Sequence, residues 1–401
     1  MGNIFSSTPV EEWNSDAHRA MEDGVSCVIC GGPFDIEGDV YGIDPKDPRF
    51  QWLYDFRLLG TIEAAISHVV ASEDSVPLNE SETGGIFLSE PAAYSMSGSQ
   101  FVQVPGHDGP RDVWYGTMQP DLGGGTLFPL HEVCLDICRR AIDSHQMKQS
   151  RTAIPNLTVL TELLNTRFDY RHVHAGTSTS KKNDLFNLCA SQDMFGPQSV
   201  LAMSRIEWWG REFEKFYANP AANFDAASFV IALLQASPRN EVAQPVSCTP
   251  RRTRVSLERL PPELIDSICA YLPVRAVISL HRTSRALHNM TPLDNMFWRD
   301  SLRQGKLHPH MRDLDTRWIE HRLSTLDSGV LDKASSWDWK GAAQLLATKR
   351  FPISGRDGRL HEIPDEYWNR CRIWSIIEEA LAEDFAATRK RNDSLVRTSI
   401  P

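Results

Sequence analysis

The chain has 401 residues, with 42 Lys and Arg against 52 Asp and Glu and a formal net charge of −10. This length predicts roughly two or three domains, and a hydrophobic fraction of 41% is enough to build cores. The acidic balance argues against nucleic-acid binding, which needs a concentrated basic face, so we expect no nucleic-acid partner.

The cysteines and the apolar runs indicate a compartment. Eight cysteines are too few to staple a chain of this length with disulfides. The N-terminus lacks the apolar segment of a secretory signal peptide, and the longest apolar run, 229–234, is far shorter than the ~18 residues that cross a bilayer. We therefore expect an intracellular protein, cytoplasmic or nuclear, with reduced thiols.

The first six residues match M-G-x-x-x-[ST], the pattern for N-myristoylation of Gly2 after Met1 is removed. A chance match in a flexible lead, 1–24, is the alternative. One myristoyl chain gives only marginal, reversible membrane binding. The residues that follow are acidic and would be repelled by anionic lipid. We expect at most weak, partial membrane association.

Short extended runs between Gly and Pro turns predict a mixed α/β domain over 25–150. Within it, 101–104 alternates as a strand does, 72–99 is polar enough to be a loop or a disordered insert, and an apolar stripe over 130–142 predicts a helix. A helical region over 151–235 and a proline-containing linker over 236–254 follow. The expected fold class is α+β, with a mainly helical second half.

Two pairs of residues in the mixed domain predict a structural zinc site. Cys27 and Cys30 lie three positions apart on a glycine-assisted turn, and His131 and Cys134 lie near one face of a predicted helix start. Three thiolates and one imidazole suit tetrahedral zinc, and Cys138 is an alternative ligand. Two other interpretations stay open: packed cysteines without metal, and a redox CxxC, for which the expected βαβ unit is not visible.

Three short helices are predicted after the linker. The first begins at Pro262, where a missing N–H costs nothing, and ends before Pro273. The second runs from Arg275 with Leu287 on its apolar side, and the third starts near Asp294. Helices this short bury little surface by themselves, so their leftover apolar residues are available to a partner.

This three-helix segment, 255–303, resembles the F-box family. The matching residues are Leu260, Pro261, Glu263, Leu264, Ile265, Ile268, Tyr271, Leu272, Pro273, Leu280, Ser284, Arg285 and Trp298. The resemblance implies a module that binds the Skp adaptor of cullin–RING ubiquitin ligases. It implies adaptor contacts, or their immediate support, at Leu260, Pro261, Ile265, Ile268, Leu272 and Leu280. An ordinary helical subdomain is the alternative.

Most of the chain is also similar to a set of large fungal F-box proteins. The matching segments are the CxxCG run at 27–31, the Pro-Leu-His-x-x-Cys run at 129–134 and the closing run at 369–374. The last of these falls in a predicted helical region over 304–388, which a tail over 389–401 follows.

The resemblance implies a non-catalytic subunit that recruits an unknown protein substrate. Such a subunit acts by proximity, because it holds the substrate where a separate enzyme can reach it. The sequence contains neither a G-x-x-x-x-G-K-[ST] phosphate loop nor a G-x-S-x-G nucleophile elbow, so we expect no enzyme. The alternatives are a zinc-stabilised scaffold or regulatory interaction protein without a ligase role, and an uncharacterised enzyme.

Overall fold

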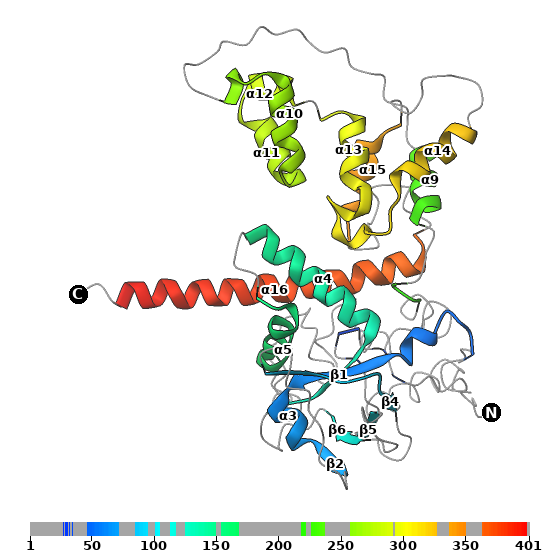
Figure 1. The fold of residues 1–401 in the computed structure, drawn as a ribbon, viewed down its shortest axis with the longest axis vertical. Helices are drawn as coiled ribbons and strands as arrows, with labels where there is room; N and C mark the ends of the chain where they lie inside the picture. Colours follow the sequence, from blue (N-terminus) through cyan, green and yellow to red (C-terminus); the bar gives the residue numbers. More distant parts are fainter. Residues whose placement is uncertain are drawn as a thin grey trace, which may run out of the picture. The chain divides into compact units, whose positions relative to one another are not determined.

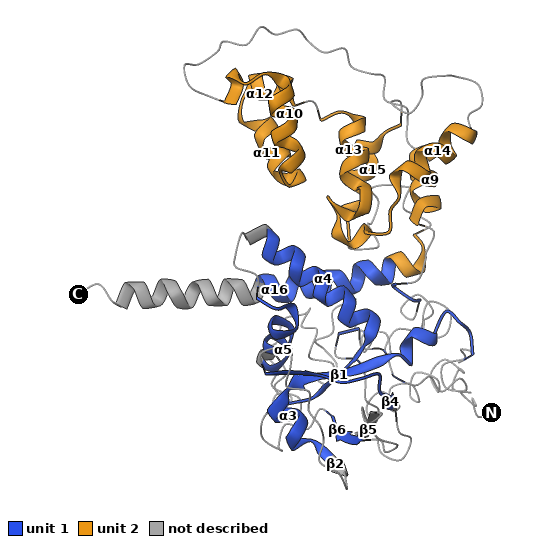
Figure 2. Cartoon of the chain, in the orientation of Figure 1, with its two compact units in different colours: residues 1–222, 368–401 blue, residues 223–367 orange. Residues whose placement is uncertain are grey.

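The computed structural model describes residues 27, 29–30, 32, 34, 46–71, 85–94, 101–104, 113–117, 125–149, 154–167, 218–221, 226–236, 257–291, 293–326, 337–349 and 363–398. This part of the chain mixes helix and sheet, as predicted (Figure 1). Its residues fall into two compact units, one within 1–222 and 368–401 and one within 223–367 (Figure 2). None of the described helices has both the length and the apolar character needed to cross a bilayer.

The first unit contains two antiparallel sheets. The first sheet has the order β3-β1-β7, formed by Ile86–Leu88, Phe56–Thr61 and Phe128–His131. The second has the order β2-β6-β5-β4, formed by Val69–Ala71, Val113–Gly116, Phe101–Val104 and Ala93–Tyr94. The predicted strand at 101–104 is confirmed as β5. The prediction of a loop over 72–99 is wrong for its described part, because β3 pairs with β1 and β4 pairs with β5.

The strand β1 is the centre of the three-stranded sheet. Its consecutive residues Leu58, Leu59 and Gly60 are all buried, so other parts of the protein cover both faces of the strand. A Cβ atom at Gly60 would lie 2.7 Å from Leu127 Cδ2 and 2.9 Å from the Thr126 carbonyl oxygen. Only glycine allows the backbones to approach this closely.

The helix predicted over 130–142 starts later and runs further than expected. It forms α4, Glu132–Gln149, after β7 has taken the two preceding residues. The β1–β7 pairing sets Phe56 opposite His131, and the Glu132 N–H donates to the Asp55 carbonyl at 2.8 Å. Tertiary pairing therefore places His131 at the end of a strand instead of inside a helix.

One hydrophobic core joins distant parts of the first unit. It includes the two cysteines of the CxxC turn, strands β1 and β7, and helices α4, α5 (Asn156–Arg167) and α16 (Asp365–Thr398). From α16 it takes Ile373, Trp374 and Ile377, all buried. Apolar residues of α16 thus share one core with the cysteines near the N-terminus. The same helix continues to Thr398, through most of the predicted tail.

The second unit is helical in its described residues. Its helices are α9 (Ala226–Ala236), α10 (Pro262–Tyr271), α11 (Val274–Thr283), α12 (Arg285–Met290), α13 (Asn295–Leu302), α14 (Thr316–Leu326), α15 (Trp339–Leu346) and the first turn of α16. Three short 3₁₀ helices, η3 (Leu257–Arg259), η4 (Arg303–Gly305) and η5 (Pro309–Met311), lie between them. Another, η1 (Gln51–Leu53), precedes β1 in the first unit.

The predicted three helices over 255–303 are in fact four. Ser284 has extended backbone angles, φ −153° and ψ 160°, and its side chain accepts a hydrogen bond from the Leu287 N–H at 3.2 Å. A serine that caps a new helix in this way ends the preceding one, so α11 and α12 replace a single second helix. The last helix, α13, packs against α14 and α15. The Arg299 guanidinium on α13 forms a salt bridge with the Glu320 carboxylate on α14, with 2.6 Å between Nη1 and Oε2.

The substitution Gly60→Ala tests the close approach at β1. The added methyl group meets a backbone oxygen that cannot move alone, so we expect the free energy of unfolding to fall by about 1–3 kcal/mol. Chemical denaturation with urea measures the change as a lower midpoint. An unchanged midpoint would contradict the packing described for this strand.

Candidate metal centre

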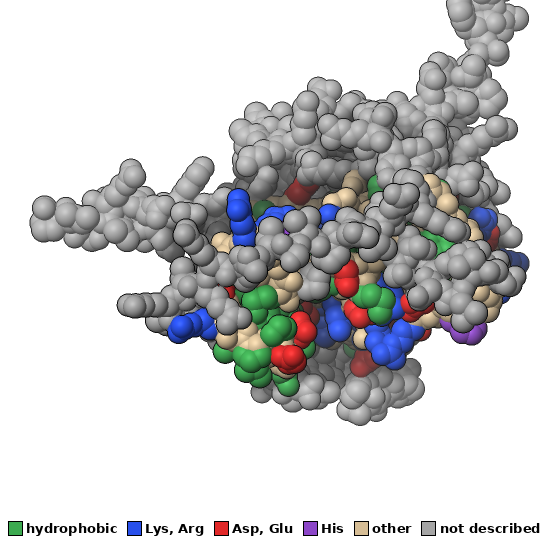
Figure 3. Space-filling view, turned by 90° about the horizontal axis from the view of Figure 1, so that it is seen from above, with side chains coloured by type: hydrophobic (Ala, Val, Ile, Leu, Met, Phe, Trp, Pro, Cys, Tyr) green, Lys and Arg blue, Asp and Glu red, His purple; other side chains and the backbone are tan. Residues whose placement is uncertain are grey.

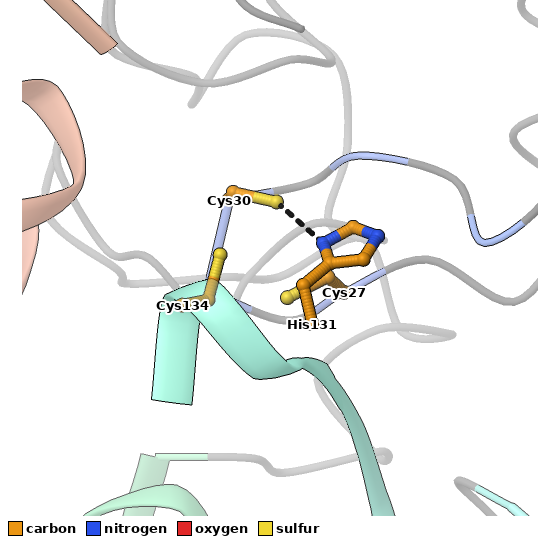
Figure 4. Close-up of side chains that lie close together, drawn as sticks. All are labelled: Cys27, Cys30, His131 and Cys134. Atoms are coloured by element: carbon orange, nitrogen blue, oxygen red, sulfur yellow. Dashed lines mark hydrogen bonds between the residues drawn. The ribbon is translucent and has the colours of Figure 1, made fainter. Parts of the chain in front are cut away.

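Four side chains from two distant segments meet in the first unit. The potential ligand atoms of Cys27, Cys30, His131 and Cys134 all lie within 4.8 Å of one another, and all four residues are buried (Figure 4). The Cys30 sulfur and the His131 Nδ1 atom lie 3.2 Å apart. The structure therefore brings together the four residues that the sequence names, and they form a cluster that could hold a metal ion.

The first pair stands on a tight turn from Cys27 to Gly32, here called the cysteine turn. The Cys27 N–H donates to the Gly32 carbonyl at 2.9 Å, and the Gly32 N–H donates to the Cys30 sulfur at 3.2 Å. A Cβ atom at Gly32 would lie 3.2 Å from that sulfur and 3.3 Å from His131 Cε1. The glycine thus lets the backbone approach both ligand side chains.

The second pair stands at the junction of β7 and α4. His131 ends the strand, and Cys134 lies in the first turn of the helix. Two aromatic rings enclose the imidazole, since the centroid of Phe34 lies 4.7 Å and that of Trp52 lies 5.0 Å from the ring centroid of His131. This apolar wall keeps water away from the cluster.

Burial and mutual contact perturb the titration of the cluster. Burial disfavours a charged Cys27, but hydrogen bonds to Cys134 and Cys30 and the charge of His131 hold the pKa of the Cys27 thiol well below its usual value. Burial also acts to lower the pKa of His131, yet the charges of Cys30 and Cys27 raise that pKa to about 10. Burial and hydrogen bonds to Cys27 and Cys30 raise the pKa of Cys134 well above its usual value. The metal-free cluster thus retains protons that a metal ion must displace.

The number and kind of the donor atoms, three sulfurs and one ring nitrogen, suit tetrahedral coordination. Zinc bonds of about 2.0–2.3 Å require ligand atoms roughly 3.5–3.8 Å apart, so shifts of about 1 Å or less would seat an ion among these side chains. The four side chains would fill all four positions of a tetrahedral ion, which is the pattern of structural sites, because catalytic sites keep a position for water. The alternative ligand Cys138 is buried one turn later on α4 and lies outside the group of four.

The structure adds two residues that the sequence does not single out. Gly32 shapes the cysteine turn, and Arg372 of α16 donates from Nη1 to the Cys30 carbonyl at 3.0 Å. The only signal for the arginine is a charged residue inside an apolar helical stripe. Its partner is 342 positions away, and no local pattern reports such a distance.

The six residues predicted for adaptor binding all lie in the second unit. Gly2, which is predicted to be acylated, lies outside the described residues. Pro261 is exposed, and Ile265 is completely buried. The other four are half-buried: Leu260, Ile268, Leu272 and Leu280.

Comparison of this chain with protein-family models, curated proteins and solved structures gives no match. Inferences about function therefore depend on the residues and the geometry described above.

Alanine substitutions at two cysteines on the same helix test the ligand set. Cys134→Ala removes one of the four converging ligands, so we expect loss of tight metal binding and a lower melting temperature in the presence of metal. Cys138→Ala is the matched control, because it removes a buried thiol outside the group and should keep one metal ion per chain. Elemental analysis of the purified proteins measures both. Loss of metal only in Cys138→Ala would assign the fourth ligand to that residue.

The apparent metal affinity should rise with pH. His131 binds a metal as a neutral ring, but its pKa, raised from 6.5 to about 10, keeps it protonated at neutral pH, and the raised pKa of Cys134 acts in the same direction. Protons therefore compete with the metal below about pH 10, while the lowered pKa of Cys27 keeps that thiolate ready to bind. Competition with a chromophoric chelator across neutral pH measures the slope. A pH-independent affinity would exclude these groups as ligands.

Proposed function

We propose that the chain is a non-catalytic, substrate-recruiting F-box subunit of a Skp–cullin–RING ubiquitin ligase, with structural zinc in its first unit. The observation that supports the recruiting role most is an exposed apolar face on α10. Leu264, Ile268 and Tyr271 occupy positions i, i+4 and i+7, here called the α10 stripe. Leu264 is 50% and Tyr271 is 92% exposed, so two large side chains of the stripe lie mainly in solvent, and an apolar patch of this kind can mark an interaction site.

The helices behind the stripe have a very small core. Among the described residues of α10, α11 and α12, the buried apolar side chains are Ile265, Val277, Ala286 and Leu287. Ile265 therefore supports the module from inside, and the proposed contact with the adaptor passes to its exposed neighbours on α10. A module that leaves apolar surface after its own packing suits docking of a helix face into a groove.

The surface charges agree with a protein partner better than with a nucleic acid. On the face drawn in Figure 3, the described basic and acidic side chains lie next to one another, and hydrophobic side chains reach the surface among them. Nucleic-acid binding requires a concentrated basic surface. We therefore assign the proposed recruiting role to protein–protein contacts, in keeping with the net charge of −10.

A second function is a zinc-stabilised scaffold without a ligase role. The closed, buried Cys₃His cluster favours it, because such sites stabilise folds and perform no chemistry. In this case the helices around α10 would be internal structure. The two functions share the zinc site and differ in whether the chain binds the adaptor.

Co-purification with a Skp-type adaptor separates the two functions. The double variant Leu264→Ala/Tyr271→Ala removes exposed side chains, so we expect adaptor affinity to fall at least about tenfold, or ~1.4 kcal/mol, with little change in stability. Met147→Ala is the matched control, because Met147 is 81% exposed in the first unit and should not affect the association.

Two results would contradict the recruiting role. One is an intact chain that binds zinc but not the adaptor, which would favour the scaffold. The other is an equal loss of adaptor affinity in the double variant and in Met147→Ala. Ile265→Ala is unsuitable as a test, because a cavity at a completely buried residue costs about 2–5 kcal/mol and would unfold the module.

A further inference from the structure

A buried arginine of α16 reaches the cysteine turn. Arg372 is 3% exposed, and its Nη1 donates to the carbonyl of the ligand residue Cys30 at 3.0 Å. Its Nε donates to the Asn369 side-chain oxygen at 2.9 Å, and the Asn369 amide donates to the Ala218 carbonyl at 2.8 Å. One hydrogen-bonded network therefore joins the cysteine turn, the segment at 218–221 and α16.

The charge of the proposed zinc site gives this arginine a role beyond packing. A zinc ion held by three thiolates and a neutral imidazole keeps one net negative charge, and the cluster is buried. A buried charge is costly unless an opposite charge lies near it. The Arg372 guanidinium places a buried positive charge at the backbone of a ligand residue, and its hydrogen bond to the Cys30 carbonyl holds the backbone that carries one thiolate.

We infer that Arg372 is a positioning residue of the metal centre and that it couples metal binding to the docking of α16. The inference rests on the proposed zinc site and deepens it. Outer-shell partners of this kind orient metal ligands and tune their affinity. Coupling is reciprocal, so a metal ion that is bound more tightly when α16 is docked must also stabilise the docked helix.

The chain offers a matched control on the same helix. Arg370 is 4% exposed, and its Nε donates to the Pro220 carbonyl at 2.6 Å. It is thus a buried arginine that binds a backbone carbonyl, as Arg372 does, but its acceptor does not belong to a ligand residue. A purely structural role for both arginines predicts equal effects on metal binding, whereas the inferred role predicts unequal ones.

Chelator competition on the full-length chain, with Zn²⁺ or Co²⁺ as the metal, tests the inference. We expect Arg372→Gln to weaken binding roughly 10–100-fold, as outer-shell substitutions do, and Arg370→Gln to remain close to the unaltered chain. Arg372→Lys should recover part of the loss, because it keeps the charge without the planar fork. The visible spectrum of the Co²⁺ form should stay tetrahedral in all three variants, because the four ligands are unchanged.

Hydrogen exchange on the unaltered chain gives an answer even if Arg372→Gln does not fold. Addition of Zn²⁺ should increase protection of the α16 amides at 369–381 more than that of the α15 amides in the second unit. Equal weakening in the two Gln variants, or no effect of Zn²⁺ on α16 exchange, would overturn the inference while leaving the zinc site in place. An unaltered chain that binds neither metal would overturn the zinc site itself.

Discussion

The meeting of three thiols and an imidazole at one buried point is the constraint on which the first unit depends. Cys30 and His131 are 101 positions apart, yet their side-chain atoms lie 3.2 Å from each other inside an apolar wall. Four polar groups brought together in such surroundings are costly without a partner that satisfies all of them. A tetrahedral metal ion would do so, and its binding free energy would then become part of the folding free energy.

The proposed metal site and the proposed surface for partner binding lie in different units of the chain. Four protein ligands would leave no position for substrate or water on a tetrahedral ion, which is the pattern of structural metal sites. The proposed partner contact lies instead in the second unit, on a helix that uses Ile265 for its own core and leaves Leu264 and Tyr271 in solvent. The two tasks can therefore be altered separately by mutation.

Helix α16 connects the end of the chain to the region near its beginning. Its apolar residues share a core with the cysteine turn. Two of its buried arginines donate to backbone carbonyls of residues that lie at least 150 positions before them in the chain. The helix also begins in the second unit, since the boundary between the units falls at Tyr367 and Trp368. If metal binding and α16 docking are coupled as inferred, metal loss would loosen the element that both units share.

The sequence by itself determined the features whose causes are local. Donor chemistry and spacing identify Cys27, Cys30, His131 and Cys134, alternation identifies the strand at 101–104, and Pro262 and Pro273 bound α10, because each depends on residues a few positions apart. Only the tertiary structure decided that β7 ends at His131 and that Arg372 meets Cys30. A strand needs a distant partner to pair with, and a buried charge is placed by whatever surrounds it. Interactions between distant segments decide these features, so local sequence patterns do not predict them.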